Sequence, residues 1–277
     1  MTRTQVLVVS LMVGVGAAGL CATGCGSVWQ QARFEREIEV QFLLPPGSGV
    51  SVVATNGSIT LAEAARDDVL VRAVVKAVSQ ERAEAVEIVG TANAGWLEVK
   101  AVWPEARKGN EGVSFVIDAP GGRMVRADTS NGAITITGFA GGAEADTSNG
   151  AVSIEGHEGP IVAETSNGKI TVLGATERVE ADTSNGTVRV ELADEGSGPV
   201  LIDTSNGSVV LVVGPGFAGQ IKTETSNGSI QVSDEAAGER VRLVTDEKKS
   251  KVVQVGEGET ESVVDTSNGS VTITIHD

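Results

Sequence analysis

The tetrapeptide Thr-Ser-Asn-Gly recurs through the second half of this 277-residue chain and constrains the fold more than any other feature. Successive copies are 18, 18, 18, 21, 21 and 41 residues apart. A degenerate copy, Val244-Thr245-Asp246-Glu247-Lys248-Lys249, lies in the middle of the longest interval, and a partial copy, Thr55-Asn56-Gly57-Ser58, lies much earlier. A fixed period of this length predicts stacked, equivalent structural units. The seven complete copies place asparagine at Asn131, Asn149, Asn167, Asn185, Asn206, Asn227 and Asn268.

Each repeat is predicted to form a strand, a turn, a second strand and a loop. Residues 179–183 and 187–192 both alternate apolar and polar residues, the pattern of half-buried strands. Ser184-Asn185-Gly186 lies between them, and Asn-Gly favours a turn because both residues tolerate the left-handed backbone region. Glycine and proline gather between repeats, so the lengthening from 18 to 21 residues is expected in that far loop.

Two arrangements satisfy this pattern. A meander would form an antiparallel hairpin at every Asn-Gly, whereas a solenoid would stack equivalent arms parallel and in register. The solenoid is favoured, because identical residues would then form columns at a spacing of ~4.8 Å, along which asparagine side chains can hydrogen-bond. We therefore predict an all-β fold, a single-stranded parallel β-solenoid (β-helix-like) of 18–21-residue coils over residues 115–277. This length has room for about eight coils.

Composition supports thin layers of short strands. Aromatic residues make up only 3% of the chain, so the core must come from Val, Ile, Leu, Ala and Thr. The formal net charge of −16 disfavours nucleic acid and anionic membrane surfaces as partners. A cationic partner or a divalent metal ion is compatible with it.

The N-terminus is predicted to be a lipoprotein signal peptide, residues 1–24. Arg3 precedes an apolar run over residues 6–20, which is too short for a spanning helix. Ala22-Thr23-Gly24-Cys25 resembles a bacterial lipobox, which implies that Cys25 carries the lipid and attaches the protein to a membrane. The alternatives are an ordinary signal peptide and an uncleaved anchor. Residues 25–40 are predicted to be a tether.

Residues 41–114 are predicted to cap the solenoid with strands and one short helix. Strands are expected over 37–61, 68–78, 96–102 and 113–117, and a helix over 79–89 with Ser79 as its N-cap. The open first coil needs such a cover, since an exposed strand edge invites aggregation.

Three features occur in order along the chain: the early strand Asn56–Thr60, the segment Phe115-Val116-Ile117-Asp118-Ala119-Pro120-Gly121, and the Asn-Gly-x-Ile/Val-x-Ile/Val units that follow. On these features the chain resembles the bacterial putative-adhesin family of β-strand-repeat proteins over residues 40–277. It implies a solenoid-like domain at the cell envelope, with no catalytic residues.

The clearest chemical constellation is an acidic residue before each turn. Stacked coils would align these carboxylates at ~4.8 Å, where like charges repel. Calcium between rungs would relieve this repulsion; alternatively, the side chains splay into water or accept turn N–H bonds. No metal site is expected around the two histidines, His157 and His276. The acidic column comprises Asp128, Asp146, Glu164, Asp182, Asp203, Glu224 and Asp265.

These features predict a non-catalytic, exported, lipid-anchored cell-envelope protein that presents a repetitive acidic surface for binding or adhesion. The envelope or surface ligand is unspecified by the sequence, and no cofactor other than calcium is indicated. The alternatives are a structural or envelope-stress signalling lipoprotein and a polysaccharide-active β-helix enzyme. The small uniform coils and the scarcity of aromatic residues argue against the enzyme.

Overall fold

The computed structural model describes residues 9–11, 34–234 and 240–276, and the chain forms two compact units, Met1–Gly132 and Ala133–Asp277. The described parts are all-β except for one short helix, and most strands pair in parallel. This parallel pairing is consistent with a β-helix-like fold. The unit boundary lies at Gly132, later than the expected boundary at residue 114. The strand that precedes it pairs with an early strand, Gly49–Val53, and so belongs to the first unit.

The first unit contains two sheets, with strand orders β1-β2-β5-β8-β4 and β9-β3-β7-β6. Its elements are β1 (Val9–Leu11), β2 (Phe34–Leu43), β3 (Gly49–Val53), β4 (Ile59–Glu63), β5 (Asp68–Ala77), α1 (Gln80–Glu84), β6 (Glu87–Asn93), β7 (Trp96–Val102), β8 (Gly112–Ala119) and β9 (Val125–Asn131). No helix among the described residues has the length and apolar character needed to cross a membrane.

Two details of the first unit correct the sequence predictions. The tether was expected to reach residue 40, but β2 begins at Phe34 and pairs antiparallel with β5, with Glu35 opposite Lys76. Glu35 forms an ion pair with Lys76, and Glu39 forms one with Arg72, across this pair of strands. Helix α1 is capped by the Ser79 side chain as predicted, but it ends at Glu84 because β6 begins at Glu87.

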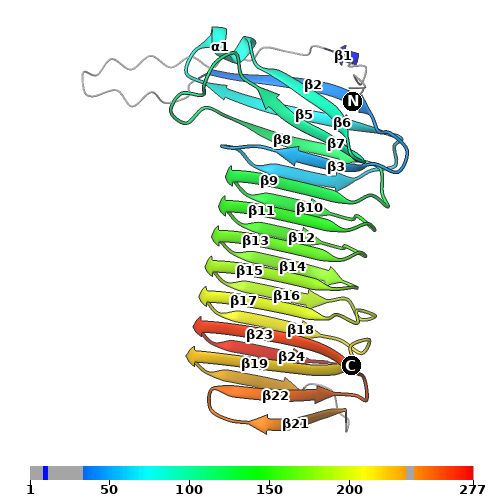
Figure 1. The fold of residues 1–277 in the computed structure, drawn as a ribbon, viewed down its shortest axis with the longest axis vertical. Coiled ribbons are helices and arrows are strands. Elements are labelled where there is room, and N and C mark those ends of the chain that lie inside the picture. Colours follow the sequence, from blue (N-terminus) through cyan, green and yellow to red (C-terminus); the bar gives the residue numbers. More distant parts are fainter. Residues whose placement is uncertain (1–8, 12–33, 235–239, 277) are drawn as a thin grey trace, which may run out of the picture. The chain divides into compact units, whose positions relative to one another are not determined.

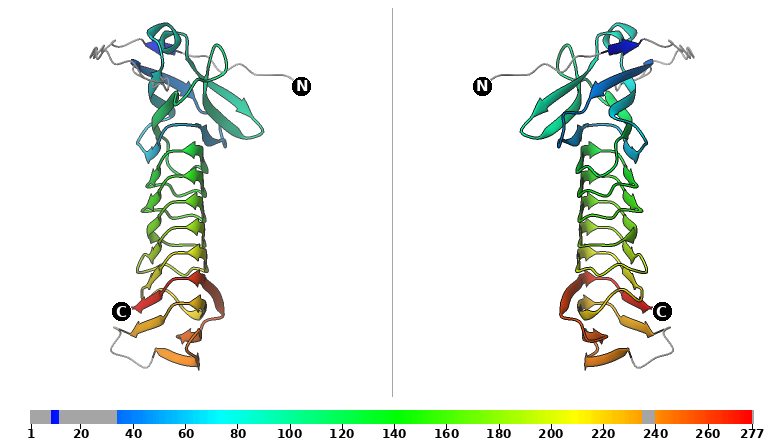
Figure 2. Two further views of the ribbon diagram at one scale, coloured as in Figure 1. Left: turned by 90° about the vertical axis from the view of Figure 1, so that its left-hand side faces the viewer. Right: turned by 90° about the vertical axis from the view of Figure 1, so that its right-hand side faces the viewer.

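The second unit consists of two long sheets that share the repeats between them (Figure 1, Figure 2). Within this unit the strand orders are β10-β12-β14-β16-β18-β24-β20 and β21-β22-β19-β23-β17-β15-β13-β11. The strands are β10 (Ile134–Thr137), β11 (Ala143–Asn149), β12 (Val152–Glu155), β13 (Ile161–Asn167), β14 (Ile170–Ala175), β15 (Val179–Asn185), β16 (Val188–Leu192), β17 (Val200–Asn206), β18 (Val209–Val213), β19 (Gly219–Asn227), β20 (Ile230–Asp234), β21 (Val241–Asp246), β22 (Ser250–Val255), β23 (Thr260–Asn268) and β24 (Val271–Ile275).

The two arms of each repeat lie in different sheets, so Ser-Asn-Gly is a corner and not a hairpin turn. Equivalent arms pair in parallel and in register: Thr147 lies opposite Thr165, and Thr165 opposite Thr183. The extra residues of the longer repeats fall in the far loop, between β16 and β17 and between β18 and β19. This excludes the meander of hairpins, and each two-strand repeat is called a coil below.

The coils do not stack in sequence order at the C-terminal end. The last coil, β23–β24, lies between β17–β18 and β19–β20, which precede it in the chain (Figure 1). Thus Asn268 is opposite both Asn206 and Asn227. From the sequence, each repeat was expected to stack on the next one in the chain. The seven tetrapeptides are nearly identical, so they contain no signal for a different order.

The degenerate copy is not a coil. Residues 244–249 form the end of β21 and the turn of an antiparallel hairpin, and β22 pairs antiparallel with β19. This copy lacks the Asn-Gly pair, so it cannot make the corner. Instead, Lys249 Nζ donates to the Gly228 carbonyl oxygen at 2.8 Å. In the other coils, the equivalent glycine carbonyl oxygen accepts from a threonine hydroxyl. The hairpin therefore ends one sheet, and the expected eighth coil does not form.

The core of the second unit is built from β-branched residues in columns. Ile170, Val188, Val209 and Val271 are fully buried in successive coils of one sheet. Burial of each such side chain contributes about 1.5–3 kcal/mol. The far loops add two fully buried rings, Phe139 and Phe217.

Candidate functional site: the repeat corner and its acidic column

The glycine of each corner is required for close approach between coils. The predicted reason, a left-handed backbone, is wrong: the corner glycines are not among the glycines with positive φ, which include the far-loop residues Gly138, Gly156 and Gly174. A Cβ on Gly186 would lie 1.7 Å from the Gly168 carbonyl oxygen, and one on Gly207 would lie 1.8 Å from that of Gly186. No side chain fits there.

The threonine of each corner bonds to the neighbouring coil. Thr183 Oγ1 donates to the Gly168 carbonyl oxygen at 3.2 Å, and Thr266 Oγ1 donates to that of Gly207 at 2.9 Å. These threonine side chains are buried, and a buried hydroxyl without a partner is costly. The pattern explains why threonine, and not valine, recurs at this position.

The asparagines form a hydrogen-bonded column along the corner. Asn185 Nδ2 donates to Asn167 Oδ1 at 3.1 Å, and Asn206 Nδ2 donates to Asn185 Oδ1 at 3.1 Å. The column continues through the inserted coil, since Asn268 donates to Asn206 and Asn227 donates to Asn268, each at 3.0 Å. At the other end of the second unit, Asn149 accepts from Asn167. In the first unit, Asn131 donates to Asn56 of the partial copy.

The acidic residues before the corners lie on paired positions of one sheet. Asp146, Glu164, Asp182 and Asp203 are exposed and follow one another across β11, β13, β15 and β17. The order then follows the threading, with Asp265 next to Asp203 and Glu224 beyond it. Asp128, on β9, is exposed in the first unit.

Electrostatics along this column disfavour full ionisation. Partial burial raises the pKa of Glu164, and the charges of Asp146 and Asp182 raise it further. Burial followed by the charge of Asp203 raises the pKa of Asp182, and burial followed by Glu224 raises that of Asp265. The folded chain therefore holds these protons more tightly than the unfolded chain does.

Neutralising a column residue is expected to stabilise the protein at neutral pH. Because the folded pKa is raised, the stability is fully present below the ordinary carboxyl range and is lost as pH rises through the folded pKa. Glu164→Gln should therefore raise Tm at pH 7 by about 1–3 °C, since exposed charges interact weakly. Thermal unfolding at pH 7 and pH 4 checks this. The gain should vanish at pH 4, and the exposed loop variant Glu177→Gln should show none; a lower Tm for Glu164→Gln at pH 7 would contradict the repulsion.

Within the described residues, no group of three or more His, Cys, Asp or Glu side chains is placed to hold a metal ion. Calcium between the rungs stays a prediction. Thermal unfolding with calcium and with EDTA tests it.

His157 is not a surface loop residue but part of the far-loop core. It is 1% exposed, and neither ring nitrogen has a hydrogen-bond partner. Desolvation lowers its pKa, and the nearby Gly141 backbone offsets part of this effect. The fully buried Phe139 and Ala175 occupy the corresponding positions of the neighbouring coils, next to glycines 138 and 174. The site therefore suits an apolar side chain.

His157→Leu is expected to stabilise the protein, most strongly at acidic pH. The folded pKa of His157 is depressed, so its charged form is disfavoured in the fold and stability is lost as pH falls from about 6.5 through the folded pKa. The variant has no such loss. Its Tm difference from wild type should grow between pH 8 and pH 5; the neighbouring loop variant Glu158→Gln should show no such growth, and a constant difference for His157→Leu would refute the assignment.

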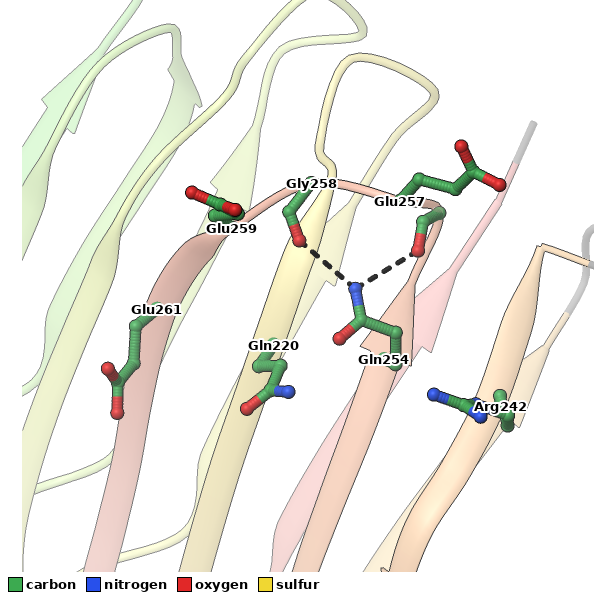
Figure 3. Close-up of a pocket in the computed structure, with 8 residues that line it drawn as sticks. Gln220, Arg242, Gln254, Glu257, Gly258, Glu259 and Glu261 are labelled. Atoms are coloured by element: carbon green, nitrogen blue, oxygen red, sulfur yellow. Dashed lines mark hydrogen bonds between the residues drawn. The ribbon is translucent and has the colours of Figure 1, made fainter.

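A shallow groove lies at the C-terminal end of the same sheet (Figure 3). A row of polar side chains crosses it, from Glu261 on β23 through Gln220 and Gln254 to Arg242 on β21. Gln254 Nε2 donates to the carbonyl oxygens of Gly256 and Gly258, at 3.0 and 3.2 Å. This amide therefore fixes the loop that joins β22 to β23. Sequence reasoning missed the groove because it treated the hairpin as a coil.

A buried ion pair in the first unit was also missed. Glu111 is fully buried, and its carboxylate accepts from Arg82 Nε and Nη2 at 2.8 and 2.7 Å. The backbone N–H groups of Val78 and Lys108 donate to it as well, at 3.1 and 2.8 Å. The hydrogen bonds from Arg82 are the largest cause that lowers the pKa of Glu111 to about 2, against the effect of burial. Nothing in the local sequence of either residue signals this pairing.

The predicted lipid-attachment residue, Cys25, lies outside the described residues, as does most of the predicted signal peptide. Residues 9–11 are described, and they form β1, which pairs antiparallel with β2.

Comparison with known proteins gives a match to part of the sequence and two similar solved structures. Residues 174–277 match a domain of unknown function, DUF7330. No curated protein matches the chain. Two solved structures are similar at 10% identity: a putative cell adhesion protein from Clostridium sporogenes, with a TM-score of 0.36 over 87% of this chain and 100% of that one, and a putative adhesin from Bacteroides fragilis, with a TM-score of 0.47 over 86% and 97%.

Proposed function

We propose that the protein is a non-catalytic, exported cell-envelope lipoprotein, anchored through Cys25, whose repeat unit presents an acidic face for binding or adhesion. In this proposal the second unit is a single-stranded parallel β-solenoid, and the first unit serves as its cap. The first unit carries a matching corner of its own, because Thr129 Oγ1 donates to the Gly57 carbonyl oxygen at 3.1 Å. Repeat arrays need such specialised ends.

The observation that carries the proposal is the aligned carboxylate column. Burial and mutual repulsion raise the pKa of three of its members, so the column is maintained at a cost to folding. Like-charged rows of this kind attract a partner with complementary charge and speed its encounter. We therefore expect an envelope or surface ligand that carries positive charge, either its own or that of bridging divalent ions.

Binding assays with a column variant test the proposal. The soluble body, residues 27–277, is immobilised and exposed to cell-envelope fractions and purified glycans. The affinity for any ligand found should fall at least tenfold in a quadruple variant of the column. This variant carries Asp146→Asn, Glu164→Gln, Asp182→Asn and Asp203→Asn. Wild-type binding should also weaken as salt rises.

A matched control removes the same charge elsewhere. Glu155→Gln, Glu177→Gln, Glu191→Gln and Glu195→Gln neutralise four acids outside the column and should leave binding intact. Equal loss in both variants would mean that net charge alone is recognised. Equal binding by both would remove the column as the binding surface, and turnover of a glycan would overturn the non-catalytic assignment.

A further inference from the structure

The last coil in the sequence lies between two coils that come before it in the chain. The C-terminal coil (β23–β24, Thr260–Ile275) fills a slot bounded by β17–β18 on one side and by β19–β20 on the other (Figure 1). Both walls of the slot precede the coil in the chain. During synthesis or refolding, the slot can therefore form before the segment that fills it.

The wall formed by β17 and β18 is joined to the C-terminal coil by hydrogen bonds of the same kinds that join the other coils. Thr266 Oγ1 donates to the Gly207 carbonyl oxygen at 2.9 Å, and Asn268 Nδ2 donates to Asn206 Oδ1 at 3.0 Å. The buried Ser262 hydroxyl accepts from the Val200 N–H at 3.0 Å. An empty slot exposes these groups and the unpaired edges of β17 and β18, and such edges favour pairing with another strand.

The opposite wall is matched in the same way. Thr225 Oγ1 donates to the Gly269 carbonyl oxygen at 3.0 Å, and Asn227 Nδ2 donates to Asn268 Oδ1 at 3.0 Å. Lys222 also forms an ion pair with Glu261. Apart from its own connecting loop, the coil makes contacts that any identical coil would make equally well.

Only a four-residue loop, residues 256–259, joins the coil to β22. This loop crosses the start of β19, because β22 and β23 pair with β19 on opposite sides. The crossing is tight, since a Cβ on Gly258 would lie 2.2 Å from the Ala218 carbonyl oxygen. A short, constrained hinge next to a terminal element favours exchange of that element between chains.

We propose that the slot is a binding site for the C-terminal coil of a second copy of this chain, so that the protein forms dimers by coil exchange. Each chain in such a dimer recovers every bond that its own coil would make. Exchange competes with the tethered coil, whose effective concentration is in the millimolar range for a short linker, so the dimer fraction should rise with protein concentration. This inference does not depend on the acidic column or its ligand.

Two single-cysteine variants of the full chain test the proposal, each in a background with Cys21→Ser and Cys25→Ser. One carries Leu201→Cys on β17 and the other Val263→Cys on β23, two half-buried positions that lie directly opposite each other. The two are unfolded, mixed in equal amounts, refolded together at rising concentration and oxidised. A disulfide-linked heterodimer should form, and its fraction should rise at least tenfold between about 1 µM and about 500 µM.

The control pair is Glu144→Cys with Val162→Cys, which are opposite each other on β11 and β13. These coils stack in sequence order, so neither fills a slot whose two walls both precede it in the chain, and this pair should give no heterodimer. A heterodimer that appears only for the slot pair supports the proposal. No slot-pair heterodimer at any concentration, or equal yields from the two pairs, would overturn it.

Discussion

Replacing Gly186 with alanine should lower the Tm of the second unit by roughly 6–12 °C. The new Cβ would overlap the Gly168 carbonyl oxygen, which lies 1.7 Å from its ideal position. That atom belongs to the backbone of a neighbouring coil, so relief requires two coils to separate. We expect a cost of about 3 kcal/mol, at the upper end for overpacked interiors, and each kcal/mol lowers Tm by about 2–4 °C at this size.

Thermal unfolding followed by circular dichroism measures this effect. Ser184→Ala is the matched control, because Ser184 lies in the same corner with an exposed side chain. It should unfold within about 2 °C of wild type, as surface substitutions usually do. Should Gly186→Ala melt as wild type does, close approach would not be the reason for the repeated glycine.

Breaking the buried pair in the first unit should have the largest effect on stability. Glu111→Gln leaves Arg82, a residue that is only 9% exposed, without its buried counter-charge. Removal of one member of a buried pair costs about 3–5 kcal/mol. Glu105→Gln is the control: Glu105 also contacts Arg82, at 3.4 Å, but its side chain is 71% exposed, so a small loss is expected. Denaturant unfolding followed by tryptophan fluorescence reports on this unit, which contains Trp96 and Trp103.

The Arg82–Glu111 pair predicts a pH dependence of stability opposite to that of the acidic column: acid destabilises the pair. The folded pKa of Glu111 is about 2, below the ordinary value of 4.5, so its contribution is present above pH 4.5 and is lost as pH falls towards 2. Wild type should lose stability over this range and Glu111→Gln should not. The double variant Arg82→Met/Glu111→Leu should recover part of the loss, because a buried pair can be replaced by apolar side chains. The recovery is incomplete because the N–H groups of Val78 and Lys108 lose their acceptor. If Glu111→Gln and Glu105→Gln lower the free energy of unfolding equally, the buried pair does not stabilise the first unit as its geometry indicates.

The sequence predicted what each repeat does locally, because alternation and fixed period are local signals. The strands, the parallel register of Thr165 with Thr183 and the placement of extra residues in the far loop all follow from them. It misjudged the corner glycine, because close approach and a left-handed backbone both select glycine. The corner glycines do not have positive φ, whereas far-loop glycines such as Gly156 do.

Order along the stack could not be predicted, for a physical reason. The ladder bonds of Asn268 to Asn206 and to Asn227 are the same as those between consecutive repeats, so the tetrapeptide does not encode which coil is its neighbour. The difference lies in connections that the repeat period conceals, such as the antiparallel hairpin of β21 and β22. The pairing of Arg82 with Glu111 was hidden for a related reason: it joins residues 29 positions apart that carry no shared pattern.

Disulfide mapping of the acidic column tests the central claim, that equivalent residues form in-register columns with the last coil inserted. Two full-chain variants are compared at low concentration in a background with Cys21→Ser and Cys25→Ser. Asp203→Cys/Asp265→Cys joins directly opposite positions and should close rapidly into an intramolecular disulfide. Asp203→Cys/Glu224→Cys joins consecutive repeats that lie two rungs apart, about 9.6 Å, beyond the reach of a disulfide. Rapid closure of the second pair but not the first would mean that the coils stack in sequence order, and closure of neither would mean that the columns do not exist.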